Sequence, residues 1–240
     1  QPLAELCDAT LVHLDTSVNG FYPTAAQVEK AITPRTKALM LCSPSNPTGR
    51  MIPADELGKI AEVVKKHQIW CISDEIYCEL TYDGHKHVSI GSFSGMKDYA
   101  IIINGFSKAF AMTGWRIGFV AAPAELTAQM CKLHQYSSIC APIMSQYAAT
   151  EGLRSAWGEV EKMRVSYQQR RNLMYKAFTD MGLPCTEPEG AFYLFPDIRS
   201  TGLTSEEFAT QLIEKHKVAV VPGNVFGAGG EGFIRCCYAT

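Results

Sequence analysis

The chain has 240 residues, 47% of them hydrophobic and 19% charged, so it can bury a large core. Its formal net charge of −2 gives no electrostatic reason to expect nucleic acid or an anionic membrane as a partner. The longest apolar runs are the length of a strand, well short of the ~18 to 20 residues that a membrane helix needs.

Nine cysteines are scattered along the chain without a CxxC pair and without a set of histidine partners. Reduced thiols in a cytoplasmic enzyme explain this pattern better than a disulfide framework or a metal site. No signal-peptide pattern opens the chain, which agrees with a cytoplasmic location. We therefore expect no bound metal.

The first half of the chain alternates strand-like and helix-like segments. Short apolar runs at 36–43, 69–74 and 100–104 are typical of buried parallel strands, and a further strand is expected at 118–122. The first two strands are separated by a helix-like stretch at 53–67. This alternation predicts an α/β fold in which helices cover a mostly parallel sheet.

Polar and irregular segments follow the first two predicted strands. The first strand leads into SPSNPTG (43–49), where two prolines and a glycine predict an irregular turn that presents the Asn46 amide. The second strand runs directly into Asp74, and a carboxylate at a buried strand end needs a cation or a shared proton. Open α/β sheets bind ligands at the carboxyl ends of their strands, so these segments predict a site there.

Lys108 follows the third strand, in the segment GFSKAFAMTGWRIG (105–118). An amine that attacks an aldehyde must be reachable, partly dehydrated and close to fixed positive charge, because these conditions favour the neutral nucleophile. Lys108 lies among small residues, eight positions before Arg116, and meets this description. A surface lysine in a loop explains the segment equally well when it is taken alone.

The second half of the chain changes to longer helices and then to short elements. A helix is expected after Pro123, and a long charged stretch at about 155–181 predicts one helix that ends at Gly182. The remaining elements are expected at 192–195, 218–221 and 233–238 (strands) and at 205–217 (a helix with Ser205, rather than Thr204, as its N-cap). We expect a large domain over 1–160 and a smaller α+β domain over 161–240.

Several of these segments resemble the signature blocks of class I/II aminotransferases, the fold type I enzymes that use pyridoxal 5′-phosphate. They occur in the order found in the family, which makes coincidence a poor explanation. The matching segments are 44–49, 73–77, 105–118, 190–196, 221–223 and 232–239. The resemblance implies the fold type I architecture, with a mostly parallel but incomplete large-domain sheet and a small α+β C-terminal domain.

The resemblance also implies roles for individual residues. Lys108 matches the lysine that forms a Schiff base with the cofactor and then moves the substrate proton. Asp74 matches the aspartate that pairs with the pyridine nitrogen. Tyr77 and Asn46 match the groups that hydrogen-bond the phenolic oxygen of the cofactor ring.

The remaining matches concern anionic groups. Ser107 and Arg116 match ligands of the cofactor phosphate, for which a planar guanidinium is well suited. Arg235 matches the residue that binds the substrate α-carboxylate, where Asn46 is expected as well. An arginine that faces water on an edge strand is the alternative explanation for Arg235.

The implied activity is transfer of an amino group between an L-amino acid and a 2-oxo acid by a homodimer. A carbon–sulfur β-lyase on the same scaffold and a catalytically inactive fragment with a structural role are the alternatives. The chain begins at Gln1 without an initiator methionine, where the family would already be inside its large domain. We therefore expect an N-terminal segment to be missing and the chain on its own to bind cofactor weakly.

Overall fold

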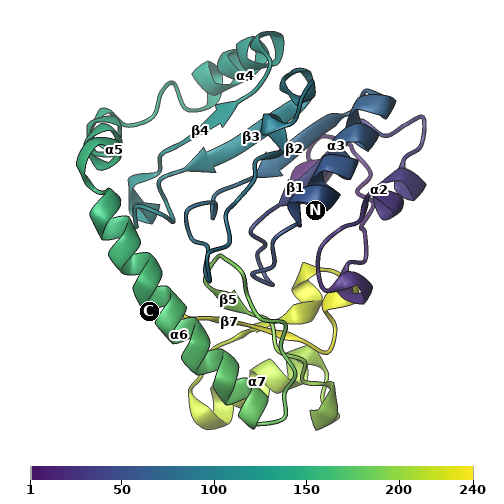
Figure 1. Cartoon of the computed structure of the whole chain (residues 1–240), viewed down its shortest axis with the longest axis vertical. Helices are drawn as coiled ribbons and strands as arrows, with labels where there is room; N and C mark the ends of the chain where they lie inside the picture. The colour runs from purple at the N-terminus through teal and green to yellow at the C-terminus, as the bar shows by residue number, and fades with distance from the viewer. Residues whose placement is uncertain (1, 240) are drawn as a thin grey trace.

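The computed structural model describes residues 2–239, which form two sheets connected by a long helix (Figure 1). The larger sheet has the order β1-β2-β3-β4, with β1, β2 and β3 parallel and β4 antiparallel to β3. Its strands are β1 (Ala38–Cys42), β2 (Trp70–Asp74), β3 (Ala100–Gly105) and β4 (Gly118–Ala121). The mostly parallel α/β sheet predicted from the sequence is confirmed.

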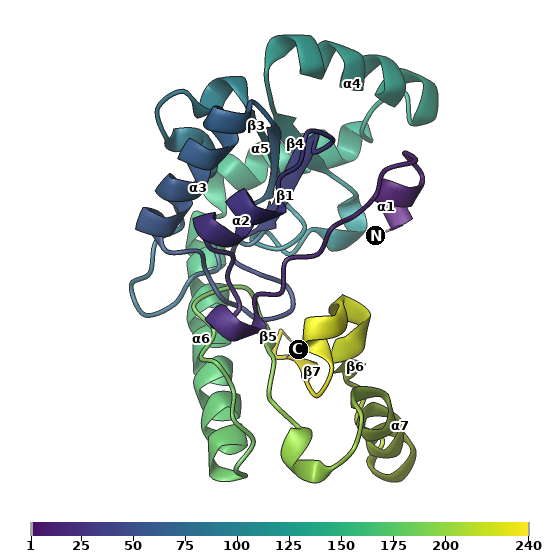
Figure 2. The ribbon, with the colours of Figure 1, turned by 90° about the vertical axis from the view of Figure 1, so that its right-hand side faces the viewer.

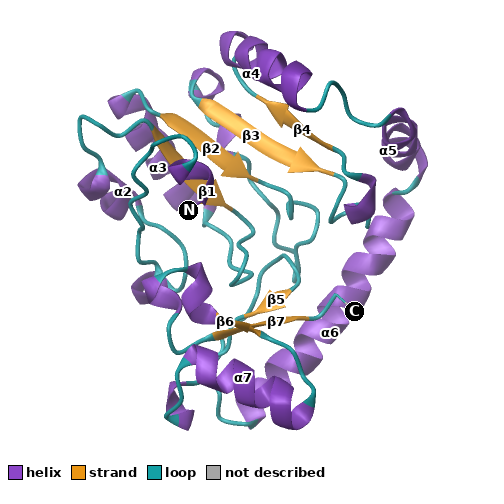
Figure 3. Ribbon diagram, turned by 180° about the vertical axis from the view of Figure 1, so that it is seen from behind, coloured by secondary structure: helices purple, strands orange, loops and turns teal. Residues whose placement is uncertain are grey.

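The smaller sheet is antiparallel and has the order β5-β7-β6. Its strands are β5 (Tyr193–Leu194), β6 (Val221–Pro222) and β7 (Ile234–Cys237). The helices are α1 (Pro2–Glu5), α2 (Ala25–Ala31), α3 (Ala54–His67), α4 (Ala124–Ser137), α5 (Ile143–Ser155), α6 (Trp157–Asp180) and α7 (Ser205–His216). Figure 3 shows α6 running along one side of the molecule from the larger sheet to the smaller one.

Two helices cover one face of the larger sheet. In α3, the buried residues Leu57, Ile60, Ala61 and Val64 recur with helical spacing, so they form one apolar stripe. Together with Val28 of α2, this stripe packs on the sheet, and Figure 2 shows both helices on the same side. On the opposite face, apolar side chains such as Met40 of β1 and Val120 of β4 are exposed.

The strand register brings the carboxyl ends of the parallel strands to one edge. Cys42 is paired with Asp74, and Asp74 is paired with Ile103 near the end of β3. Side chains alternate along a strand, so Asp74 lies on the face opposite α3, while Ser73 and Glu75 lie on the α3 side. The segments that follow β1, β2 and β3 therefore start next to one another, as the sequence predicted.

One predicted helix start is wrong. The N-cap of α7 is Thr204, whose hydroxyl accepts the Glu207 N–H at 3.2 Å while the Glu207 carboxylate accepts the Thr204 N–H at 2.9 Å. This reciprocal capping box requires Glu or Gln three residues after the cap, which Thr204 has in Glu207 and Ser205 lacks. The Ser205 hydroxyl accepts the Gly232 N–H instead.

Three helices, α1, α2 and α5, were not predicted from the sequence. The start of α2 carries a readable signal, because Thr24 and Gln27 form another capping box. Short 3-10 turns complete the chain: Ser17–Asn19, Ile90–Ser92, Met96–Asp98, Thr113–Trp115, Arg199–Thr201, Gly223–Phe226 and Ala228–Gly230. Among the described helices, none combines the length and the apolar character needed to span a bilayer.

The two sheets meet where the 43–49 turn packs against residues 188–190. The Gly49 carbonyl accepts the N–H groups of Glu189 and Gly190, both at 2.9 Å. Gly49 has a φ of +70°, and a Cβ built there would lie 2.5 Å from the Cβ of Pro188. Only glycine fits this position, both because of its backbone conformation and because of the close approach.

We predict that Gly49→Ala lowers the free energy of unfolding by roughly 2 to 5 kcal/mol. About 1 to 2 kcal/mol comes from the positive φ and about 1 to 3 kcal/mol from overpacking against Pro188. Gly84→Ala is the matched control, because Gly84 has a similar φ of +78° but no atom within 4 Å of its Cβ position. Urea unfolding of the two variants measures the difference, and equal losses would contradict a tight junction between the sheets.

Candidate active site

Asp74 ends β2 with a half-buried carboxylate. Its Oδ1 accepts the Ile76 N–H at 3.1 Å, and Oδ2 has no hydrogen-bond partner among residues 2–239. Burial raises the pKa of Asp74, against the lowering effects of this hydrogen bond and of the Lys108 charge. A half-buried acceptor without a donor fits a protonated ring nitrogen, which supplies both an N–H and a positive charge.

Lys108 lies in the turn that follows β3, with its side chain half-buried. The Nζ atom lies 5.9 Å from the ring centroid of Tyr77 and 5.6 Å from that of Phe192. Within the described part of the chain, no acceptor hydrogen-bonds this amine. The two aromatic rings contact the amine without taking up a conventional hydrogen bond, so Nζ stays available to a ligand.

Tyr77 lies beside Lys108 and is linked to the smaller sheet. Its hydroxyl is 3.0 Å from the hydroxyl of Tyr193, which belongs to β5. Burial raises the pKa of Tyr77, and the hydrogen bond with Tyr193 adds to the rise, so the phenol keeps its proton. Tyr193 was not predicted as a site residue, although it falls in the 190–196 segment that resembles the family.

Arg235 of β7 reaches the turn after β1. Its Nη1 donates a hydrogen bond to the Asn46 Oδ1 at 2.8 Å. The guanidinium carbon lies 4.5 Å from the ring centroid of Tyr193 and 5.2 Å from that of Phe226. Since β7 is the central strand of its sheet and Arg235 is half-buried, an arginine facing water on an edge strand is ruled out.

No carboxylate among residues 2–239 forms an ion pair with Arg235. One amide oxygen uses a single N–H of the guanidinium, which leaves the other donors free for an anion. The two flanking rings fix the plane of the guanidinium, as a bidentate contact with a carboxylate requires. The arrangement can therefore bind a small carboxylate ligand.

Ser107 and Arg116 lie in the same loop as Lys108 and are joined through Thr113. The Thr113 hydroxyl donates to the Ser107 carbonyl, and the Arg116 Nη1 donates to the Thr113 carbonyl, both at 2.8 Å. Arg116 is exposed, and the Ser107 side chain is half-buried. Thr113 was not predicted as a site residue, although it falls in the 105–118 segment that resembles the family.

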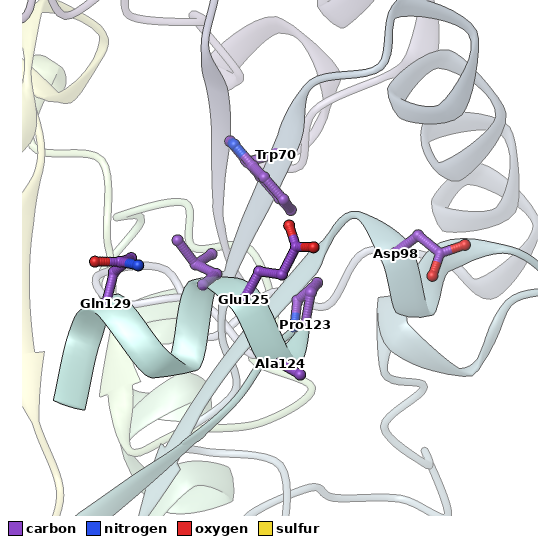
Figure 4. Close-up of a pocket in the computed structure, with 7 residues that line it drawn as sticks. Trp70, Asp98, Pro123, Ala124, Glu125 and Gln129 are labelled. Atoms are coloured by element: carbon purple, nitrogen blue, oxygen red, sulfur yellow. The ribbon is translucent and has the colours of Figure 1, made fainter.

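A surface pocket of about 540 Å³ lies at the opposite end of the strands (Figure 4). It is lined by Trp70 at the start of β2, by Asp98, and by Pro123 and Glu125 at the start of α4. None of the residues described above lines it. Among residues 2–239, no three His, Cys, Asp or Glu side chains come together in a way that could bind a metal ion.

Comparison with known proteins points to one family. The family described as "Aminotransferase class I and II" matches residues 1–240. The putative aminotransferase YugH of Bacillus subtilis is 53% identical over 239 residues, which is 99% of this chain and 62% of that protein. Aromatic-amino-acid aminotransferase 2 of Thermococcus litoralis is 46% identical over 92% of this chain and 58% of its own length.

Solved structures agree with the sequence relatives. The aromatic aminotransferase of Pyrococcus horikoshii superposes with a TM-score of 0.91 at 45% identity, over 93% of this chain and 60% of that one. A double mutant of the Thermus thermophilus aspartate aminotransferase gives 0.93 at 37% identity, over 99% and 62%. The fold type I architecture is thereby confirmed, and the chain spans about 60% of these relatives' lengths. The chain belongs to the class I and II aminotransferase family.

Proposed function

We propose that the protein containing this chain is an aminotransferase that uses pyridoxal 5′-phosphate to move an amino group between an L-amino acid and a 2-oxo acid. The observation that carries the proposal is the grouping of Asp74, Lys108 and Arg235, three charged residues, where the two sheets meet. The similar proteins described above are aminotransferases by name, which favours amino transfer over a carbon–sulfur β-lyase. These three charged side chains have no ion-pair partner within residues 2–239, which also argues against a purely structural role.

The cofactor would be held by residues at the carboxyl edge of the larger sheet. When bound, pyridoxal phosphate supplies an aldehyde carbon for amines and a ring that withdraws electrons from the substrate α-carbon. The free Oδ2 of Asp74 accepts the N–H of the ring nitrogen and stabilises its positive charge. Ser107 and Arg116 bind the phosphate, the serine with its hydroxyl and the arginine with its guanidinium.

Two further residues would contact the ring substituent. Tyr77 and the Nδ2 group of Asn46 would donate hydrogen bonds to the phenolic oxygen. Asn46 can do this because its bond with Arg235 uses only Oδ1. Lys108 would bind the aldehyde carbon and, once displaced by substrate, would move a proton between the substrate α-carbon and the cofactor.

Arg235 orients the amino acid. Its free N–H groups would bind the α-carboxylate, while the rings of Tyr193 and Phe226 contact the guanidinium. Asn46, hydrogen-bonded to Arg235, keeps the substrate-binding group and the cofactor-binding group in one rigid unit. The substrate carboxylate and the ring are thereby held at a constant separation, which lowers the entropic cost of reaction.

We also propose a domain division and an assembly. Residues 1–160 form the large cofactor-binding domain, and residues 161–240 form the small one. The full-length protein is a cytoplasmic homodimer, in which a second copy covers the exposed apolar stretch of α4 and α5. That stretch contains Leu133, Tyr136, Ile139, Ile143, Met144 and Tyr147. All nine cysteines are free thiols, as expected in a reducing compartment.

The first prediction concerns Lys108. Borohydride reduction of the cofactor-loaded, full-length protein should fix the cofactor covalently on Lys108, as measured by mass spectrometry of its peptides. Lys108→Ala should abolish the label. Lys86 and Lys132, both exposed, serve as internal controls and should stay unmodified. A label on either of them, with none on Lys108, would remove the basis of the proposed function.

A second prediction concerns Arg235. Arg235→Leu should raise the KM for the amino donor by the equivalent of roughly 2 to 5 kcal/mol, because one partner of a desolvated ion pair is lost. The cofactor Kd should change little. Arg199→Leu is the control, since Arg199 also lies over a ring but is exposed and paired with Asp197. Loss of cofactor with an unchanged KM would assign Arg235 to the phosphate instead.

A third prediction concerns Asp74 and stability. Its pKa is raised in the folded protein, so ionised Asp74 destabilises the fold above that pKa, and the penalty disappears as pH falls. Asp74→Asn, which keeps the Ile76 hydrogen bond, should stabilise the cofactor-free protein at pH 7 by up to about 1 kcal/mol. Asp74→Asn should also slow removal of the substrate α-proton by a factor of roughly 10² to 10⁴.

Thermal unfolding at pH 7 and at pH 3 tests the stability part of this prediction. The advantage of Asp74→Asn should be present at the higher pH and absent at the lower one. A variant that is less stable than the parent at pH 7 would mean that Asp74 has a stabilising partner.

A further inference from the structure

A second acid, Glu75, lies directly after Asp74 but on the other side of the sheet. Its side chain is 4% exposed, and it takes no part in the proposed chemistry. The Ser73 hydroxyl donates to its Oε1 at 3.1 Å, and the Ser89 hydroxyl donates to the same oxygen at 2.8 Å. The Glu75 N–H donates to the Ile103 carbonyl, so the backbone at this position is tied to β3.

His87 balances this buried carboxylate. Its Nε2 lies 3.0 Å from the Glu75 Oε2, and its side chain is 11% exposed. Neither ring nitrogen forms a hydrogen bond of good geometry within residues 2–239, so Nε2 stays close to the carboxylate without another partner. Two hydroxyl donors alone compensate a buried negative charge poorly, so the imidazole supplies what they lack.

The charge of Glu75 acts on the groups around it. Burial would raise the pKa of Glu75, but His87, Ser89 and Ser73 hold it below the ordinary value. Glu75 in turn adds to the rise in the pKa of Asp74 that burial causes. It adds likewise to the effect of burial on Cys71 and Cys78, whose thiol pKa values rise to about 12 and about 11.

We propose that His87 is a positioning residue of the aminotransferase site: by pairing with Glu75 behind the sheet, it sets how readily Asp74 carries a negative charge toward the cofactor ring. Without the imidazole, two consecutive carboxylates at one half-buried strand end would repel each other. With the imidazole present, the negative charge of Glu75 is compensated on the α3 side of the sheet. Asp74 is then left as the anion that faces the ring nitrogen.

This inference rests on the proposed function, but the effect of His87 and Glu75 on the Asp74 carboxyl can be measured without cofactor. The Asp74 carboxyl is titrated by ¹³C NMR in the cofactor-free, full-length protein, with Asp74→Asn used to assign the signal. The variants are His87→Asn, Glu75→Gln and the double substitution. His85→Asn is the control, because His85 is an exposed histidine in the same loop.

The two single substitutions should act in opposite directions. His87→Asn leaves Glu75 uncompensated and should raise the titration midpoint of Asp74 by on the order of half a pH unit. Glu75→Gln removes the repelling charge and should lower the midpoint by a similar amount. The double variant should return close to the parent, and His85→Asn should have no effect. In the cofactor-loaded protein, the absorbance midpoint of the lysine-bound cofactor should shift with the same signs.

A merely structural role predicts a different pattern. If the pair only supports the fold, both single variants should move the Asp74 midpoint in the same direction, or not at all, and the double variant should be the most altered; either result overturns the inference. If Glu75→Gln does not fold, the rescue of His87→Asn by the double substitution decides the question alone. Failure of the proposed function would show separately, as absence of borohydride label on Lys108 in the unaltered protein.

Discussion

The half-buried carboxylate of Asp74, held without a donor for one of its oxygens, is the interaction on which the site depends. Removing a charge from water costs free energy unless a partner takes its place, so the fold carries this cost until a ligand arrives. Lys108 and Arg235 are in a similar condition, since aromatic rings, not acids, hold their charged groups. A site of this kind is prepared for a ligand with complementary charge, and the stability lost there is recovered on binding.

The junction between the two sheets gives these residues their geometry. The contacts that cross it include the packing of Gly49 on Pro188, the hydrogen bond between the Tyr77 and Tyr193 hydroxyls, and the bond from Arg235 to Asn46. Each joins a segment that follows a strand of the larger sheet to an element of the smaller one. Arg235 of β7 and the turn that follows β1 are therefore joined directly at this junction.

The sequence was a good guide wherever the signal was local. Strand ends, the turn at 43–49 and the lysine segment follow from short runs of residues, and strand register then brings them together. Contacts between residues apart in the sequence could not be predicted, because nothing in the chain relates Arg235 to Phe226 and Tyr193 as ring contacts, or Glu75 to His87 as a buried pair. The N-cap of α7 was predicted at the wrong residue for a simpler reason. Thr204 and Ser205 both carry a hydroxyl that could cap the helix, and the Glu207 side chain forms the capping box with Thr204.

The larger sheet is bounded by β1 on one side and by β4 on the other, and within residues 2–239 neither outer strand has a second neighbour. Each exposes a row of backbone donors and acceptors that another strand can pair with. Met40 and Val120 add apolar surface beside these edges. A second polypeptide carrying a strand of matching register could therefore extend the sheet at either edge, so this unit is open to association through backbone pairing.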